Sequence, residues 1–164
     1  MLLISASDLT VRSEQHQAAI RAAATAGVRH VVYTSALSPE PPNPAAIAPS
    51  HYATERALAA SGLTWTVLRN SLYAEYQVPE AAQALSTGVL PHNRGDGRIA
   101  YVSREDCAAV AAVVMAAPGH EGRVYDVTGP DLFTADDVAA LYGELGGRSV
   151  DTESLDDNTF VERL

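Results

Sequence analysis

A chain of 164 residues is long enough to bury a sizeable core and suits a single domain. Its formal net charge of −9 argues against electrostatic binding to a phosphate backbone, so no nucleic-acid partner is expected. No apolar run reaches the ~18 residues of a transmembrane helix, and the N-terminus lacks the pattern of a secretory signal, so we expect a cytoplasmic protein with no membrane partner.

The first predicted element is a short apolar strand. Residues 2–5 are expected to be buried on both faces, which is typical of parallel sheets covered by helices on each side. A helix is predicted over 11–26, because alanines recur there at helical spacing, and Gly27 is expected to end it. A second strand is predicted over 30–34.

A proline-rich segment follows the second strand. Residues 38–50 hold five of the nine prolines and are predicted to form a loop rather than a regular element. Because this loop leaves the C-terminal end of a strand, it is either a lid or substrate loop or a plain surface excursion, and the sequence favours neither.

Strands and helices continue to alternate along the rest of the chain. A hairpin turn is predicted at Gly95–Gly97, and capping-box spacing after Ser103 and Thr134 predicts two helix starts. The alternation indicates βαβ units, and hence an α/β fold with one domain over residues 1–164. The other predicted elements are helices over 51–60, 79–85 and 155–164, a helix that reaches residue 116, and strands over 63–68, 98–102, 123–128 and 149–152.

The cysteine and the histidines give little sign of special chemistry. Cys107 is the only cysteine, so it cannot form an internal disulfide, and its alanine-rich helical setting favours a small core residue over a reactive thiol. His16, His92 and His120 lack the spacing of a metal site, so no metal is expected.

Seven short segments in a fixed order span nearly the whole chain: Leu2–Ser7, Tyr33–Ser35, His51–Glu55, Val67–Asn70, Gly95–Ala100, Ser103–Asp106 and Gly119–Tyr125. Together they resemble the NmrA-like branch of the short-chain dehydrogenase/reductase superfamily, and within it the bacterial NAD(P)H:quinone oxidoreductase subgroup. The resemblance implies a partial Rossmann-like domain, a doubly wound parallel sheet with NADP or NAD as cofactor. It also implies a small-molecule substrate, a quinone.

Members of this family are longer at both ends. The resemblance aligns residues 2–5 with the fourth strand of the family's sheet, so the first three strands, the glycine-rich turn for the pyrophosphate and the C-terminal cap are missing. We therefore expect weak or undetectable NADPH binding by residues 1–164. The first strand would present an unpaired edge, and a homodimer formed through that edge is expected to compensate in part.

The resemblance places one set of residues beside the cofactor. Ser5, Ala6 and Ser7 would lie near its ribose and phosphate groups, or else form only a tight turn between strand and helix. Thr34 and Ser35 would lie near the nicotinamide, although hydroxyls are common at strand ends. The loops that close over the nicotinamide would contribute Asn70, Ser71, Tyr73, Glu75 and Val102.

A second set of residues is considered for proton transfer. His51 and Glu55 stand on one helix face, where the superfamily usually carries Tyr-x-x-x-Lys, and a carboxylate would raise its partner's pKa rather than lower it. The resemblance implies catalytic roles for His51 and Tyr73, with His51 contacting the substrate rather than acting as the acid. The alternatives are a surface histidine at a helix start and ordinary packing of Tyr73 against Tyr76.

Three functions follow as hypotheses. The first is an NAD(P)H-dependent oxidoreductase that transfers a hydride to a quinone, supported by Asn70 and Tyr73 in the subgroup pattern. The second is a non-catalytic dinucleotide-binding, redox-sensing regulator, favoured by the departure from Tyr-x-x-x-Lys. The third is an inactive fragment.

Overall fold

The computed structural model describes residues 1–163 and divides into two compact units, each with its own core. Unit 1 comprises residues 1–71 and 105–127, and unit 2 comprises residues 72–104 and 128–163. The predicted single domain over residues 1–164 stays a prediction. The two units are described separately below.

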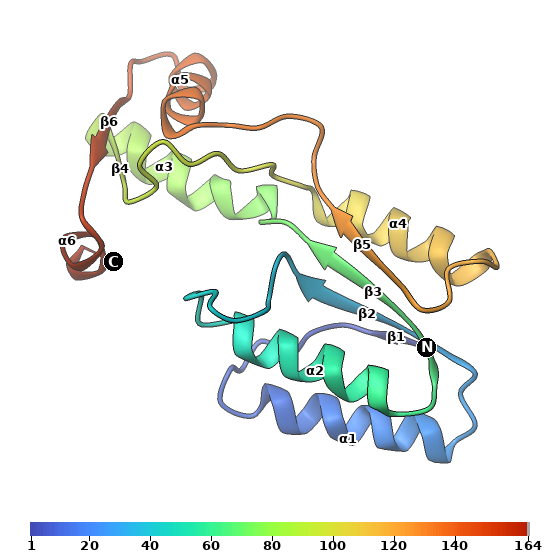
Figure 1. The fold of residues 1–164 in the computed structure, drawn as a ribbon. Helices are drawn as coiled ribbons and strands as arrows, with labels where there is room; N and C mark the ends of the chain where they lie inside the picture. The colour runs from blue at the N-terminus through green and yellow to red at the C-terminus, as the bar shows by residue number, and fades with distance from the viewer. Residues whose placement is uncertain (164) are drawn as a thin grey trace. The chain divides into compact units, whose positions relative to one another are not determined.

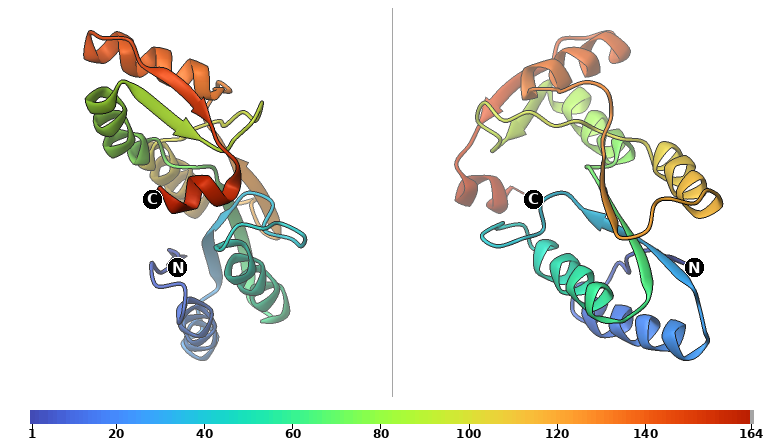
Figure 2. Two further views of the ribbon diagram at one scale, coloured as in Figure 1. Left: turned by 90° about the vertical axis from the view of Figure 1, so that its left-hand side faces the viewer. Right: turned by 45° about the vertical axis from the view of Figure 1, so that its right-hand side comes forward.

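Unit 1 is a four-stranded parallel sheet with helices outside it (Figure 1). The strand order is β1-β2-β3-β5, so β1 and β5 form the two edges of the sheet among the described residues. Helices α1 and α2 lie side by side on one face, and α4 lies on the other (Figure 2). The elements are β1 (Leu2–Leu3), α1 (Arg12–Thr25), β2 (His30–Ala36), α2 (Ala48–Ala60), β3 (Thr64–Asn70), α4 (Arg104–Ala116) and β5 (Arg123–Val127).

The apolar pattern of the sequence explains this layering. Strand β2 is buried from Val31 to Ser35, as expected for a strand covered on both faces. The core on the α1 and α2 side combines residues from both helices with alternate residues of the strands, namely Leu3, Ile20, Ala23, Val31, Tyr33, Leu58 and Val67. Cys107 on α4 is buried, which confirms its predicted place in the core. The predicted α/β class is therefore confirmed.

The first strand is shorter than predicted. Only Leu2 and Leu3 pair with β2, and Ile4 is 66% exposed, so the expectation of a strand over residues 2–5 buried on both faces is wrong. The chain leaves the sheet after Leu3, and the Ser5 amide then donates to the side chain of Thr34 instead of continuing the ladder. Pairing along the strand, which sets its length, is not encoded in its apolar pattern alone.

Unit 2 packs helices α3 and α5 against a two-stranded parallel sheet of β4 and β6. Its core joins α3, β4 and α5 through Ala84, Leu90, Val138, Ala139 and Tyr142. The capping box predicted at Thr134 is present and begins α5. The elements are η1 (Ala74–Tyr76), α3 (Gln77–Thr87), β4 (Val89–His92), α5 (Ala135–Gly146), β6 (Asp151–Ser154) and α6 (Asp157–Glu162).

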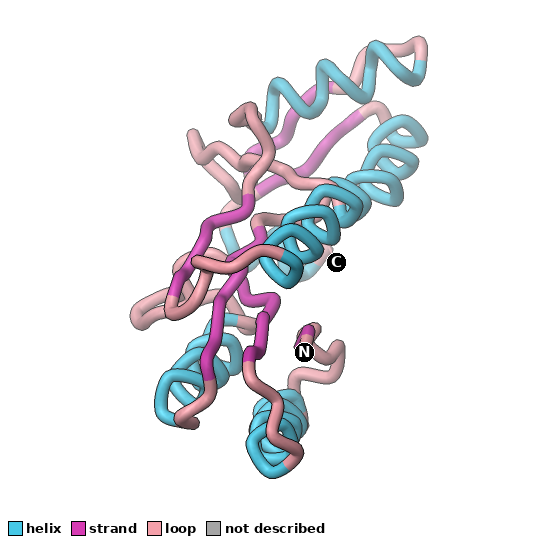
Figure 3. The backbone as a smooth tube through the Cα atoms, turned by 90° about the vertical axis from the view of Figure 1, so that its right-hand side faces the viewer, coloured by secondary structure: helices cyan, strands magenta, loops and turns pink. Residues whose placement is uncertain are grey.

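The predicted hairpin in unit 2 is wrong. Residues 98–102 form no strand and contribute only two isolated bridges, one between Ile99 and Phe133 and one between Tyr73 and Val102. The preceding strand β4 was not predicted, because it is short and contains Pro91, and it pairs in parallel with β6. Figure 3 shows the strands as magenta segments among cyan helices and pink loops. None of the helices within residues 1–163 combines the length and the apolar character that a membrane span requires.

Candidate functional site

The carboxyl ends of three adjacent strands in unit 1 form a polar edge. Thr34 pairs in register with Leu68, and Ala36 pairs with Asn70, so the ends of β2 and β3 lie next to each other. The Ser5 amide after β1 donates to Thr34 Oγ1 at 3.2 Å. The structure therefore brings together the residues predicted at the three strand ends, and such edges are where open α/β sheets bind ligands.

The turn after β1 is held by side chains of α1. The Ala6 amide donates to His16 Nε2 at 3.0 Å, and the Ala6 carbonyl accepts from Arg12 Nε at 2.5 Å. Both side chains are buried, with exposed fractions of 2% for His16 and 7% for Arg12. The residues 5–7 are thus a turn with side-chain support. Sequence reasoning missed Arg12 and His16, although their spacing of four residues places them on one helix face.

His51 lies in the interior of unit 1. Its exposed fraction is 5%, so the alternative of a surface histidine is wrong. Helix α2 begins at Ala48, earlier than predicted, so His51 is not the first residue of the helix. His51 is one of the buried residues of α2. Its Nδ1 lies 2.8 Å from the Tyr33 hydroxyl, and its Nε2 lies 3.4 Å from Arg12 Nη1. Both ring nitrogens are therefore engaged inside the unit.

The protonation state of His51 follows from these partners. A guanidinium can only donate, so His51 Nε2 accepts from Arg12 and the ring proton lies on Nδ1, facing Tyr33. Burial, together with the nearby charge of Arg12, lowers the pKa of His51 to about 4. The ring is therefore neutral near pH 7. The catalytic role of His51 stays a prediction, and this geometry favours a positioning role over proton donation.

Glu55 does not pair with His51. Its Oε1 accepts from Ser35 Oγ at 2.7 Å, and both carboxylate oxygens accept from Arg69, at 3.0 Å from Nε and 2.7 Å from Nη2. Arg69 also forms an ion pair with Glu40, in the proline-rich loop. The Glu55 and Arg69 side chains are 11% and 17% exposed. This arrangement raises the pKa of Arg69, chiefly through its hydrogen bonds to Glu55.

The ion-pair network explains two features of the sequence. It neutralises the Glu55 carboxylate, and it ties the loop of residues 38–47 to β3 through Glu40. Sequence reasoning missed Arg69, although an arginine inside the apolar run of β3 was a signal that a buried carboxylate would meet it. Asn70 and Ser71 are buried at the end of the same strand, and the Ser71 amide donates to the Val127 carbonyl.

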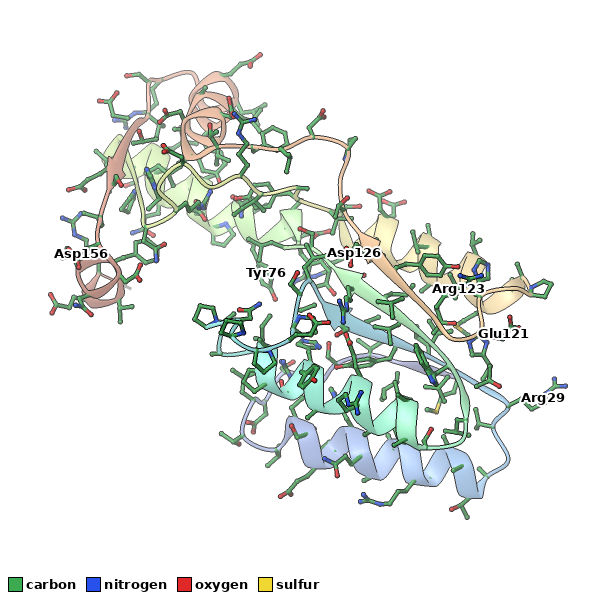
Figure 4. The ribbon with its side chains drawn as sticks, in the orientation of Figure 1. Arg29, Tyr76, Glu121, Arg123, Asp126 and Asp156 are labelled. Atoms are coloured by element: carbon green, nitrogen blue, oxygen red, sulfur yellow. The ribbon has the colours of Figure 1, made fainter. Side chains whose placement is uncertain are left out.

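In unit 2, the structure brings together the other predicted residues. Tyr73 and Val102 form a bridge, and the Arg104 amide donates to Glu75 Oε1 at 2.8 Å. The Arg104 guanidinium lies 5.2 Å from the Tyr73 ring centre and 5.1 Å from that of Tyr76, whose rings are 6.0 Å apart. Figure 4 labels the Tyr76 side chain, which lies directly before α3. The packing of Tyr73 against Tyr76, named above as the alternative, is therefore present.

An apolar cavity of about 390 Å³ lies in unit 2 between α3 and α5. Gln77, Ala81, Tyr101, Phe133 and Tyr142 are among its lining residues. The Tyr142 hydroxyl donates to Gln77 Oε1 at 2.8 Å, and the Tyr101 hydroxyl accepts from Arg94, so the polar groups of these rings are already engaged. Within residues 1–163, no cluster of three or more metal-ligating side chains is found.

Comparison with known proteins identifies relatives along the whole chain. Residues 2–118 match a family described as NAD(P)H-binding. Quinone oxidoreductase 2 of Escherichia coli is 40% identical over all 164 residues, which cover 57% of that relative. An NmrA-like family domain-containing oxidoreductase of Aspergillus flavus is 32% identical, over 94% of this chain and 51% of the relative.

A solved structure shows a similarity of the same kind. The crystal structure of an NADPH-dependent quinone oxidoreductase from Escherichia coli in complex with NADPH superposes on this chain with a TM-score of 0.94 and 40% identity. The superposition covers 99% of this chain and 57% of that one. The chain thus spans about half the length of the curated relatives that it matches.

Proposed function

The chain belongs to the NAD(P)H-binding family, and from this premise we propose that it serves in hydride transfer from NAD(P)H to a quinone. The observation that carries the proposal is the polar edge of unit 1, where Ser5 lies just beyond β1, Thr34 lies near the carboxyl end of β2 and Asn70 ends β3. The similarity to a quinone oxidoreductase of Escherichia coli supports a quinone as the acceptor.

The residues at this edge fit the nicotinamide and ribose part of a dinucleotide. Hydroxyl and amide side chains both donate and accept hydrogen bonds, and ribose hydroxyls and a carboxamide need such mixed partners. The small side chains of Ser5, Ala6 and Ser7 leave room for a ligand to approach the backbone. We assign these three residues to the ribose side, and Thr34, Ser35 and Asn70 to the carboxamide side.

The proposed reaction depends more on the orientation of the two reacting rings than on acid catalysis. When bound, the dinucleotide supplies the hydride, and an electron-poor quinone that accepts it becomes a stabilised phenolate. A strong general acid is therefore not needed, which agrees with a His51 held neutral and facing Tyr33. The contribution of this chain is to hold the two reacting rings in a fixed relation, and such positioning is itself a large source of rate.

The test measures NADPH oxidation by the chain with benzoquinone as acceptor. Thr34→Val removes the hydroxyl at the centre of the edge and is expected to lower kcat/KM by about tenfold or more, a loss of about 1.4 kcal/mol. Thr34→Ser keeps the hydroxyl and serves as the matched control, with activity expected within about threefold of the wild type. Wild-type turnover no faster than the reaction without protein would refute the proposal.

A second candidate function is a dinucleotide-binding regulator without turnover. It is favoured by the partners of His51 and Glu55, which are bound to Tyr33, Arg12, Ser35 and Arg69 rather than arranged as a proton-donating pair. The same assay separates the two functions. NADPH binding, measured by fluorescence titration, without benzoquinone reduction would exclude the enzyme and leave the regulator.

A further inference from the structure

The turn that follows β1 is held through its backbone by one helix. Both peptide groups of Ala6 are occupied, its amide by His16 Nε2 and its carbonyl by Arg12 Nε. His16 and Arg12 are four residues apart and therefore lie on the same face of α1. A short turn whose donor and acceptor are both bound by buried side chains has its two peptide planes fixed in orientation.

Donor and acceptor roles decide the state of His16. A backbone amide can only donate, so His16 Nε2 accepts from Ala6 and the ring proton lies on Nδ1. His16 Nδ1 then donates to Thr54 Oγ1, at 2.9 Å, and the Thr54 hydroxyl donates in turn to the Ser50 carbonyl at 2.8 Å. Each donor in this chain points the same way, from the Ala6 amide of the turn through His16 to Thr54 and Ser50 on α2, and the chain requires a neutral histidine.

Helix α2 supports Arg12 as well. Arg12 Nη1 lies 3.5 Å from Ser50 Oγ and 3.4 Å from His51 Nε2. These partners, and the Ala6 carbonyl, are all neutral groups, although Arg12 is buried. A buried cation that meets neutral groups costs free energy that a purely structural turn need not spend. Because Arg12 lies beside the polar edge, we look to the candidate site for the function that offsets this cost.

We propose that Arg12 and His16 are positioning residues, which fix the turn of residues 5–7 so that it presents its small side chains and backbone to the dinucleotide. This inference rests on the proposed function. The two residues act together, because the charge of Arg12 disfavours a second positive charge on His16 and so preserves the acceptor that Ala6 needs. Burial is the larger cause of the lowered pKa of His16, and Arg12 adds to it.

The arrangement predicts a dependence on pH. The groups that face His16 are Arg12 on its own helix, the edge-on ring of Tyr33 from β2 at 5.5 Å, and His51 from α2. A protonated His16 would lose the acceptor at Nε2 and would place its N–H against the Ala6 amide. The turn is then released, and affinity for the dinucleotide is expected to fall as the pH drops below the ordinary histidine range.

The test compares two variants at position 16. His16→Gln carries a side-chain oxygen that can accept from Ala6, whereas His16→Leu removes the acceptor at similar bulk. Two measurements are made, hydrogen exchange of the Ala6 amide by NMR and the Kd for NADPH by titration. His16→Leu is expected to speed Ala6 exchange and to raise Kd, each by about tenfold, the size of one hydrogen bond.

The control variant distinguishes a positioning role from a merely structural one. His16→Gln is expected to keep Ala6 exchange and Kd within about threefold of the wild type and to flatten the pH dependence of Kd, because glutamine does not titrate. Equal Kd values for the wild type and His16→Leu would refute this inference alone. Because weak binding is expected of residues 1–164, the titration extends to millimolar NADPH, and a wild type that binds none even there would refute the proposed function, and with it the cofactor role of the turn.

Discussion

Replacing Glu55 with glutamine would test the ion-pair network beside the polar edge. The substitution keeps the shape of the side chain but leaves Arg69, which is 17% exposed, with Glu40 as its remaining carboxylate. Removing one partner of a buried ion pair costs about 3–5 kcal/mol. Because Glu40 still offsets part of the charge, we expect a loss of about 2 kcal/mol in the free energy of unfolding of unit 1.

The assay is urea unfolding followed by the fluorescence of Trp65. This is the only tryptophan, and it lies on β3 in unit 1, so the signal reports on that unit. With a denaturant slope of about 2 kcal/mol/M, the transition midpoint should fall by about 1 M urea. Glu40→Gln is the matched control and should shift the midpoint less, because the Glu40 side chain is 46% exposed and solvent screens its charge. An unchanged midpoint for Glu55→Gln would refute this reasoning.

Three further predictions concern stability. Tyr33→Phe removes the partner of His51 Nδ1 and should cost about 1–3 kcal/mol in urea unfolding, with no loss if the bond is absent. Because the pKa of His51 is lowered from 6.5 to about 4, its contribution is complete above pH 6.5 and is lost as the pH falls toward 4, by about 3 kcal/mol, which urea midpoints measured across that range would reveal. Gly129→Ala would bring a Cβ to 2.0 Å from the Tyr101 carbonyl oxygen and should lower the melting temperature of unit 2 in tyrosine near-UV circular dichroism. Gly146→Ala, which meets only a flexible side chain, should change it less.

Much of the fold could be predicted from local pattern. The observed α1, β2, α2 and β3 lie within a few residues of the predicted ranges, because their apolar periodicity matches the structure they adopt. The capping box at Thr134 was predicted from spacing alone, because the contact that it makes is local. The NmrA-like resemblance is confirmed by relatives along the whole chain.

The wrong predictions of secondary structure share a cause. The length of β1, the loop at residues 98–102 and the pairing of β4 with β6 all depend on contacts between segments far apart in the sequence. Strand propensity describes how a residue fits a pleated surface and says little about which neighbour the strand will find. The predicted hairpin failed for this reason, because residues 89–92 pair with a segment about 60 positions further along the chain.

The sequence by itself determined the α/β class, the order of the elements in unit 1 and the polar residues at its strand ends, because each depends on periodicity and on residue type. The tertiary structure decided what those residues do. It buries His51 beside the Tyr33 hydroxyl and pairs Glu55 with Arg69 and Ser35. It also bonds the backbone of Ala6 to the side chains of Arg12 and His16. The reason is physical: hydrogen-bond partners and burial set the charge and the proton position of a side chain, and both arise only when distant segments meet.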